Sequence, residues 1–117
     1  MKADTAVLAL RALAHDSRLA AFRLLVQAGP GGLSVGELRD ALDLPPATLT
    51  AHLNQLRANG LVADEREGRV IRVRADYAAM DRLLGFLTEN CCGGAACTPA
   101  ARPLATTAPA PSRKSRR

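Results

Sequence analysis

The 117-residue chain has few aromatic side chains: they make up 3% of it, as Phe22, Phe86 and Tyr77, and there is no tryptophan. Its core must therefore be built from Leu, Ala and Val, which suits small helices better than a β-sandwich. No apolar run approaches the roughly 18 residues of a membrane-spanning helix, and the N-terminus carries no signal-peptide pattern. We therefore expect a small cytoplasmic domain that makes no membrane contact and that dimerisation would help to stabilise.

Acidic residues are missing from the end of the chain. Residues 98–117 hold five basic residues and no acid, whereas the remainder holds 11 of each sign, so the net charge of +5 comes from this tail. The charge balance alone therefore does not indicate nucleic-acid binding by the folded part. Because the tail's Ala, Pro, Thr and Arg cannot bury a core, we expect a folded domain over residues 1–92 and a tail over 93–117, disordered apart from Cys97.

Apolar periodicity predicts a series of helices followed by a hairpin and a last helix. The helices are expected at residues 5–14, 17–28, 35–42, 46–59 and 77–89, and the strands at 61–66 and 70–74 around Glu67-Gly68. Asp16 or Ser17 can cap the second helix, and Ser34 with Glu37 has the spacing of a capping box. Two short helices joined by a tight turn and followed by a hairpin predict a winged helix-turn-helix, mainly α with a β-hairpin wing.

The helix expected over residues 46–59 carries no acidic residue. Its leucines fall on one face, and the opposite face is small and polar, which suits a helix that enters the major groove of DNA. The alternative is a solvated helix face without a partner. His52 lies toward the buried edge and is expected to hold backbone or phosphate rather than to read a base. The candidate DNA contacts on this helix are Ala47, Thr48, Thr50, Ala51, His52, Asn54 and Arg57.

The predicted hairpin is rich in arginine. A wing would meet the DNA backbone or the minor groove, and we expect Arg66, Arg69 and Arg72 to make contacts there. The alternative is a solvated strand face on which arginines pair with nearby acids. The residues concerned are the arginines Arg66, Arg69, Arg72 and Arg74 and the acids Asp64, Glu65 and Glu67.

Two stretches carry a family pattern. Residues 10–25, LRALAHDSRLAAFRLL, contain a Leu-Ala-His-x-x-Arg-Leu stretch, and residues 44–62, LPPATLTAHLNQLRANGLV, contain a Thr-x-Thr-x-His-Leu core followed by Ala-Asn-Gly-Leu-Val. Over about residues 5–90 the chain resembles the ArsR/SmtB family of bacterial metal- and metalloid-responsive repressors. The resemblance implies a homodimer packed through its first and last helices. It also implies binding to double-stranded operator DNA at an imperfect inverted repeat and release by an effector ion.

The chain departs from the sensing sites of that family. Residues 37–42 read Glu-Leu-Arg-Asp-Ala-Leu, without the cysteines of the family's best-known arsenic site. Residues 76–90 contain no histidine for the zinc site on the last helix. Neither of these sensing sites can therefore be carried over to this chain. Ala51 stands where the family's recognition helix commonly has a histidine, so the resemblance does not define the operator sequence.

The cysteines Cys91, Cys92 and Cys97 lie within seven positions. Gly93-Gly94 allow the chain to reverse, so that Cys97 could fold back onto the pair. Three thiolates suit a soft ion such as As(III) or Sb(III) better than Zn²⁺, which normally takes four ligands in a structural site. Some members of the resembled family sense arsenite through such cysteines. We therefore expect an arsenite-responsive repressor that derepresses resistance genes.

Other ligands and other protein classes stay open. Methylarsenite could bind through two thiols, neighbouring thiols can serve as a redox or persulfide switch, and Cd(II) or Pb(II) could replace arsenic. A winged-helix module with incidental cysteines is a further alternative. We expect neither an enzyme nor a required cofactor, because the sequence has no Cys-x-x-Cys at a helix start, no phosphate-cradling glycine loop and no nucleophile–base constellation.

Overall fold

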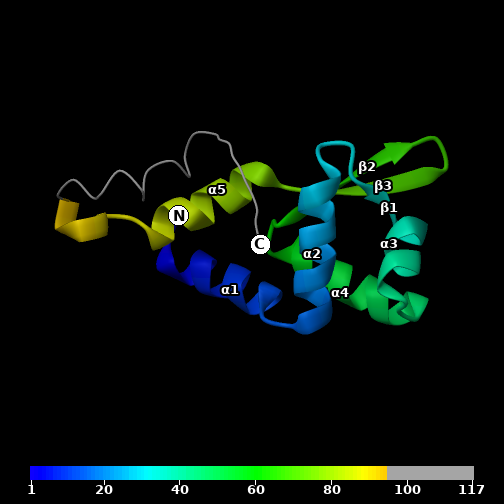
Figure 1. The fold of residues 1–117 in the computed structure, drawn as a ribbon, viewed down its shortest axis with the longest axis horizontal. Helices are drawn as coiled ribbons and strands as arrows, with labels where there is room; N and C mark the ends of the chain where they lie inside the picture. Colours follow the sequence, from blue (N-terminus) through cyan, green and yellow to red (C-terminus); the bar gives the residue numbers. More distant parts are fainter. Residues whose placement is uncertain (95–117) are drawn as a thin grey trace. The chain divides into compact units, whose positions relative to one another are not determined.

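The computed structural model describes residues 1–94 (Figure 1). The chain divides into a first unit, Met1–Leu87, and a second that begins at Thr88. Cys97 and the rest of the predicted tail beyond Gly94 lie outside the described residues. The predicted functional division after residue 92 stays a prediction.

The first unit combines helices with a small antiparallel sheet. Its helices are α1 (Ala3–Leu13), α2 (Asp16–Ala28), α3 (Val35–Leu42), α4 (Pro46–Ala58) and α5 (Tyr77–Leu87), and its strands are β1 (Leu33–Ser34), β2 (Val62–Glu67) and β3 (Val70–Ala75). Every predicted helix and both predicted strands are present within a few residues of their expected bounds. The mainly helical fold with a hairpin wing confirms the predicted winged helix-turn-helix.

The sheet differs from the prediction in two respects. Its strand order is β1-β3-β2, and β1, which the sequence analysis missed, pairs with β3 through Leu33↔Val73. The hairpin register ends at Glu67↔Val70, so the turn is Gly68-Arg69, one residue later than expected. A strand of two residues is too short to show an alternating pattern, so only its partner in the fold reveals it.

The helix starts show one confirmed cap and one correction. Ser34 and Glu37 form the predicted capping box at α3, with Ser34 Oγ accepting from the Glu37 N–H at 3.1 Å and Glu37 Oε1 accepting from the Ser34 N–H at 2.8 Å. The prediction that Asp16 or Ser17 caps α2 is wrong. His15, whose backbone is extended, is the N-cap, and its Nδ1 accepts from the Ser17 N–H at 3.1 Å. Asp16 and Ser17 are already helical.

Leucines and alanines from all five helices form the core, as expected. The side chains of Leu25, Leu38, Leu49 and Leu56 are fully buried, and Phe22 is the buried aromatic residue among those described. In Figure 1, α1 and α5 lie at one end of the first unit, and α3 and the wing lie at the other. No helix within residues 1–94 has the length and apolar character needed to cross a lipid bilayer.

Candidate nucleic-acid interface

Helix α4 presents the predicted face. It begins at Pro46 and buries three leucines, Leu49, Leu53 and Leu56, against the core. Away from these leucines, Ala47, Thr48, Thr50, Ala51 and Asn54 are exposed, whereas His52 and Arg57 are half-buried at the edges of the buried face. The helix contains no acidic side chain. The structure therefore brings five of the candidate residues of α4 to its open side and leaves His52 and Arg57 at the edges, and the contact of all seven with DNA stays a prediction.

Two arginines stand open at the tip of the wing. Arg66 lies near the end of β2 and Arg69 lies in the hairpin turn, and both are exposed. Neither takes part in any of the ion pairs found among residues 1–94. These two guanidinium groups are therefore available to a phosphate backbone.

The other two wing arginines are engaged within the fold. Arg72 donates from Nε to the Gly31 carbonyl at 2.9 Å and from Nη2 to the Gly32 carbonyl at 3.1 Å. It also lies 3.6 Å from a carboxylate oxygen of Glu37 and 3.9 Å from one of Glu67. Arg74 lies 3.8 Å from a carboxylate oxygen of Glu65. Arg72 and Arg74 thus pair with strand acids, as the alternative for this face predicts. Arg72 also holds the loop that contains Gly31 and Gly32, which we call the glycine loop, against β3.

A hydrogen-bonded link joins α4 to the wing. Arg57 donates from Nη1 to Asn54 Oδ1 at 2.9 Å and from Nε to Asp64 Oδ1 at 3.1 Å. Its Nε lies 3.0 Å from the other carboxylate oxygen of Asp64. This role of Asp64 was not predictable from the sequence, because only the fold of the Gly60 turn brings β2 beside the end of α4.

His52 lies where α4 meets the start of α2. Its ring packs against the ring of His15, with centroids 4.5 Å apart and planes tilted by 48°. Arg18 is fixed nearby, because its Nε donates to the Ala12 carbonyl at 2.7 Å. Burial, and then the charges of His15 and Arg18, lower the pKa of His52. The predicted position at the buried edge is confirmed, and a contact with phosphate stays a prediction.

The cysteine segment belongs to the second unit. Cys91 and Cys92 stand in a short 3₁₀ turn, Cys91–Gly94, and both residues are exposed. Their Sγ atoms are 3.7 Å apart. Cys92, Gly93 and Gly94 have left-handed backbones, with φ of 59°, 65° and 90°, a conformation that glycine adopts readily.

The third predicted ligand, Cys97, falls outside the described part of the chain. Within residues 1–94, no three His, Cys, Asp or Glu side chains come together as a metal site. The three-cysteine site therefore stays a prediction.

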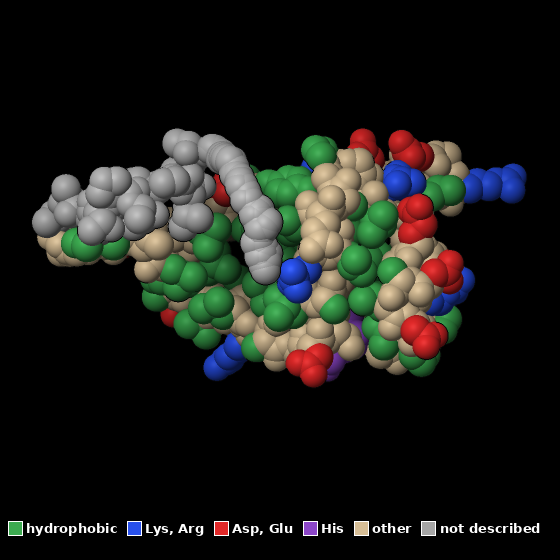
Figure 2. Space-filling model, viewed as in Figure 1, with side chains coloured by type: hydrophobic (Ala, Val, Ile, Leu, Met, Phe, Trp, Pro, Cys, Tyr) green, Lys and Arg blue, Asp and Glu red, His purple; other side chains and the backbone are tan. Residues whose placement is uncertain are grey.

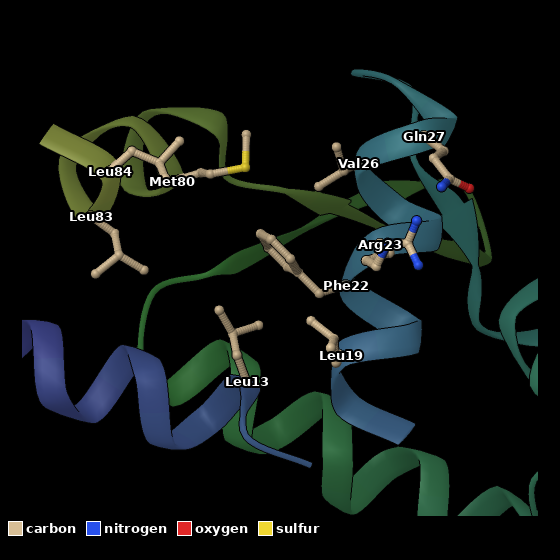
Figure 3. Close-up of a pocket in the computed structure, with 9 residues that line it drawn as sticks. All are labelled: Leu13, Leu19, Phe22, Arg23, Val26, Gln27, Met80, Leu83 and Leu84. Carbon is tan, nitrogen blue, oxygen red and sulfur yellow. The ribbon is translucent and has the colours of Figure 1, made fainter. Parts of the chain in front are cut away.

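An apolar pocket of about 320 Å³ lies between α1, α2 and α5. Phe22 and Leu13 point into it, and Arg23 and Gln27 of α2 are the polar residues among those that line it (Figure 3). Leu19 and Leu84 line the pocket and are also exposed, by 46% and 53%. The pocket thus opens onto an apolar part of the surface.

Helix α1 exposes most of its larger apolar side chains. It buries Ala6, Ala9 and Ala12, and leaves the longer side chains beside them at the surface. Figure 2 shows hydrophobic side chains gathered over α1 and α5, whereas charged side chains gather around α3 and the wing. We call the exposed large apolar residues of these two helices the apolar end face: Val7, Leu8, Leu10, Leu84 and Leu87.

Known proteins are similar to this chain in sequence and in fold. A helix-turn-helix domain family matches residues 13–65. The repressor SmtB of Mycobacterium tuberculosis is 40% identical over 75 residues, which cover 63% of this chain and 53% of SmtB. The structure of reduced HlyU from Vibrio cholerae is 34% identical, with a TM-score of 0.58, over 72% of this chain and 88% of HlyU. An ArsR-like regulator from Rhodococcus is 26% identical, with a TM-score of 0.66, over 87% of this chain and 88% of that one.

The chain belongs to the ArsR/SmtB family of winged helix-turn-helix transcriptional regulators. The resemblance read from residues 10–25 and 44–62 is thereby confirmed. These relatives are transcriptional regulators and not enzymes, which agrees with the expectation for this ArsR/SmtB-family chain. SmtB is a repressor, whereas HlyU is an activator. The chain spans 53–66% of the length of the curated relatives it matches.

Proposed function

We propose that this chain is a homodimeric repressor that binds an inverted-repeat operator in the cytoplasm and leaves it when As(III) or Sb(III) binds Cys91, Cys92 and Cys97. The observation that carries the proposal is the vicinal cysteine pair, with sulfur atoms 3.7 Å apart, only a few residues after the last helix of an ArsR/SmtB winged helix-turn-helix.

The DNA-binding part of the proposal rests on α4 and the wing tip. The open face of α4 is small and polar and carries no acid, so it can approach base edges without repelling phosphates. Arg66 and Arg69 supply positive charge for the backbone. Arg72 contributes to binding mainly by holding the wing and the glycine loop in place.

The homodimer rests on the apolar end face. Exposed apolar residues gathered on neighbouring helices indicate a protein–protein contact, and the two-fold symmetry of a dimer matches that of an inverted repeat. A second copy packed on α1 and α5 would cover Leu8 and Leu84, which are 50% and 53% exposed. It would also close the mouth of the apolar pocket, to which Leu84 belongs.

Arsenite binding to the cysteines in their reduced, thiol form needs no oxidant. In the trihydroxide form of arsenite, each As–O bond is replaced by an As–S bond, and each thiol proton leaves with the displaced hydroxide as water. The arsenic stays trivalent. Cys91 and Cys92 can supply two sulfurs to one ion from adjacent positions, and Cys97 would complete the three-coordinate set.

Ligation would act on DNA through α5. The cysteine pair follows closely on this helix, which carries Leu84 and Leu87 of the proposed dimer contact. A constraint on the chain after α5 would change the angle between subunits and hence the spacing of the two α4 helices. By linkage, operator DNA must weaken arsenite binding by the same factor by which arsenite weakens DNA binding.

Fluorescence anisotropy of the full chain on its own promoter DNA, in a non-thiol reductant, tests this function. Stoichiometric arsenite should release the DNA. The variants C91S, C92S and C97S should bind DNA with unchanged affinity and should not release it. Loss of DNA affinity in these variants without arsenite would show that the cysteines are structural and would overturn the proposal.

A thiol redox or persulfide response is the second candidate. It is favoured by the proximity of the Cys91 and Cys92 sulfur atoms, and by HlyU, a relative whose structure is known in a reduced form. In that case an oxidant or a persulfide donor would release DNA and arsenite would not. Cd(II) and Pb(II), tested alongside methylarsenite in the same assay, separate the remaining thiophilic effectors.

A further inference from the structure

Asn54 lies on the exposed side of α4, and its amide is oriented by the fold. Its Oδ1 accepts the hydrogen bond from Arg57 Nη1 at 2.9 Å. Because a guanidinium has donors only, the oxygen and not the nitrogen of the amide must face Arg57. The Nδ2 amino group, for which no partner is found among residues 1–94, then points its donors elsewhere.

Asp64 keeps Arg57 in this position. Its carboxylate oxygens lie 3.1 Å and 3.0 Å from Arg57 Nε, so the guanidinium is held between the wing strand β2 and Asn54. The Arg57 side chain is only 28% exposed. Its charge is therefore compensated within the fold, and Arg57 is a positioning residue for Asn54 rather than a group that reaches for phosphate.

The orientation of the amide decides which base it can read. Adenine offers an acceptor at N7 and a donor at N6 in the major groove, so an asparagine reads it with both its amino group and its carbonyl oxygen. Guanine offers two acceptors, O6 and N7, which require donors alone. The Asn54 oxygen already uses one of its two lone pairs on Arg57 and faces that guanidinium, so it is a weaker acceptor for the adenine amino group, whereas both donors of the Asn54 amino group stay available to guanine.

We infer that Asp64, acting through Arg57, fixes Asn54 as a hydrogen-bond donor and thereby selects guanine over adenine at the base that Asn54 contacts. The inference rests on the proposed DNA-binding function and adds a specificity determinant to it. The inference also explains why the carboxylate of Asp64 is tolerated on the strand that follows α4, since the Arg57 guanidinium neutralises its charge.

The test begins with selection of bound sequences from a randomised duplex library by the full chain. The variant N54A identifies the position that Asn54 reads, as the one where base preference is lost. Anisotropy titrations then compare duplexes that carry guanine or adenine at that position. The ratio of the two dissociation constants is the readout, because it is insensitive to uniform changes in affinity.

The wild type should prefer guanine by about tenfold, the size expected for one good base contact. D64A, which removes the anchor of Arg57, and R57M, which removes the donor, should both reduce this ratio to about twofold or reverse it. E65A is the matched control, because Glu65 also lies on β2 and pairs with an arginine, Arg74, that does not touch Asn54. E65A should keep the wild-type ratio.

The outcomes separate this inference from the proposed function. A wild-type chain that selects sequences but prefers adenine at the Asn54 position overturns the inference, as do D64A and R57M variants that keep the guanine preference. An N54A variant that changes no position also overturns it. A wild-type chain that binds no DNA sequence overturns the proposed function instead.

Discussion

A single glycine fixes the approach of the α2–β1 loop to the sheet. Gly32 has φ of +67°, and a Cβ placed on it would collide with the backbone carbonyl of Val73. The change G32A should lower the free energy of unfolding by about 2 kcal/mol or more, because it combines left-handed strain with a clash against backbone that cannot move aside. Urea denaturation followed by circular dichroism measures the loss.

Gly68 provides the matched control for this change. It also has a left-handed backbone, with φ of +61°, but no atom lies within 4 Å of its virtual Cβ. G68A should therefore cost about 1 kcal/mol, the strain alone. Equal losses for the two variants would contradict the close approach at Gly32.

His52 makes the stability of the fold depend on pH. Burial, followed by the charges of His15 and Arg18, lowers its pKa below the ordinary 6.5. As the pH falls through 6.5, the unfolded chain takes up the proton before the folded one does, so acidification favours unfolding. The free energy of unfolding should therefore fall with pH from 6.5 down to the lowered pKa of His52, and H52Q should flatten this part of the pH profile.

The variant H15N tests the cause of that shift. Asparagine can still cap α2, as His15 does, but it removes the ring that packs against His52. H15N should keep α2 intact and make the pH dependence shallower without abolishing it, since burial and Arg18 remain. If the free energy of unfolding of H52Q depends on pH as steeply as that of the wild type, groups other than His52 cause the pH dependence.

At the scale of elements, the start of α3 depends on its capping box. Ser34 Oγ satisfies the Glu37 N–H, and the Glu37 carboxylate satisfies the Ser34 N–H. S34A should lower the free energy of unfolding by about 1 kcal/mol. S34T, which keeps a hydroxyl acceptor, should lose much less in the same urea titration, and equal losses for both variants would contradict the role of the cap.

How far the sequence predicts each element depends on the range of the interactions that form it. The helices and the Ser34 cap follow from neighbours within four positions, so periodicity and spacing predict them. Strand β1 and the bonds of Arg72 to Gly31 and Gly32 join residues about 40 positions apart, and no local pattern indicates them. The open face of α4 was predictable because helical periodicity also places its buried leucines. The bond between Asp64 and Arg57 was not predictable, because it depends on how β2 folds back beside α4.

At the scale of the whole molecule, α1 is the clearest sign of a missing partner. A helix that buries only alanines and exposes Val7, Leu8 and Leu10 leaves most of its larger apolar side chains in water. The proposed homodimer would bury them and would set the distance between two recognition helices. Association should therefore be sensitive to a charge on this face.

The change V7E tests this arrangement against a matched control, V70E. Val7 and Val70 are the same residue type and are each 46% exposed, but Val7 lies on α1 and Val70 at the tip end of the wing. V7E should raise the dimer dissociation constant at least tenfold in sedimentation equilibrium, because a buried carboxylate would lack a partner, whereas V70E should leave it unchanged. If V70E dissociates the dimer and V7E does not, the subunits meet through the wing, and the proposed route from the cysteines through α5 to the spacing of the α4 helices fails with it.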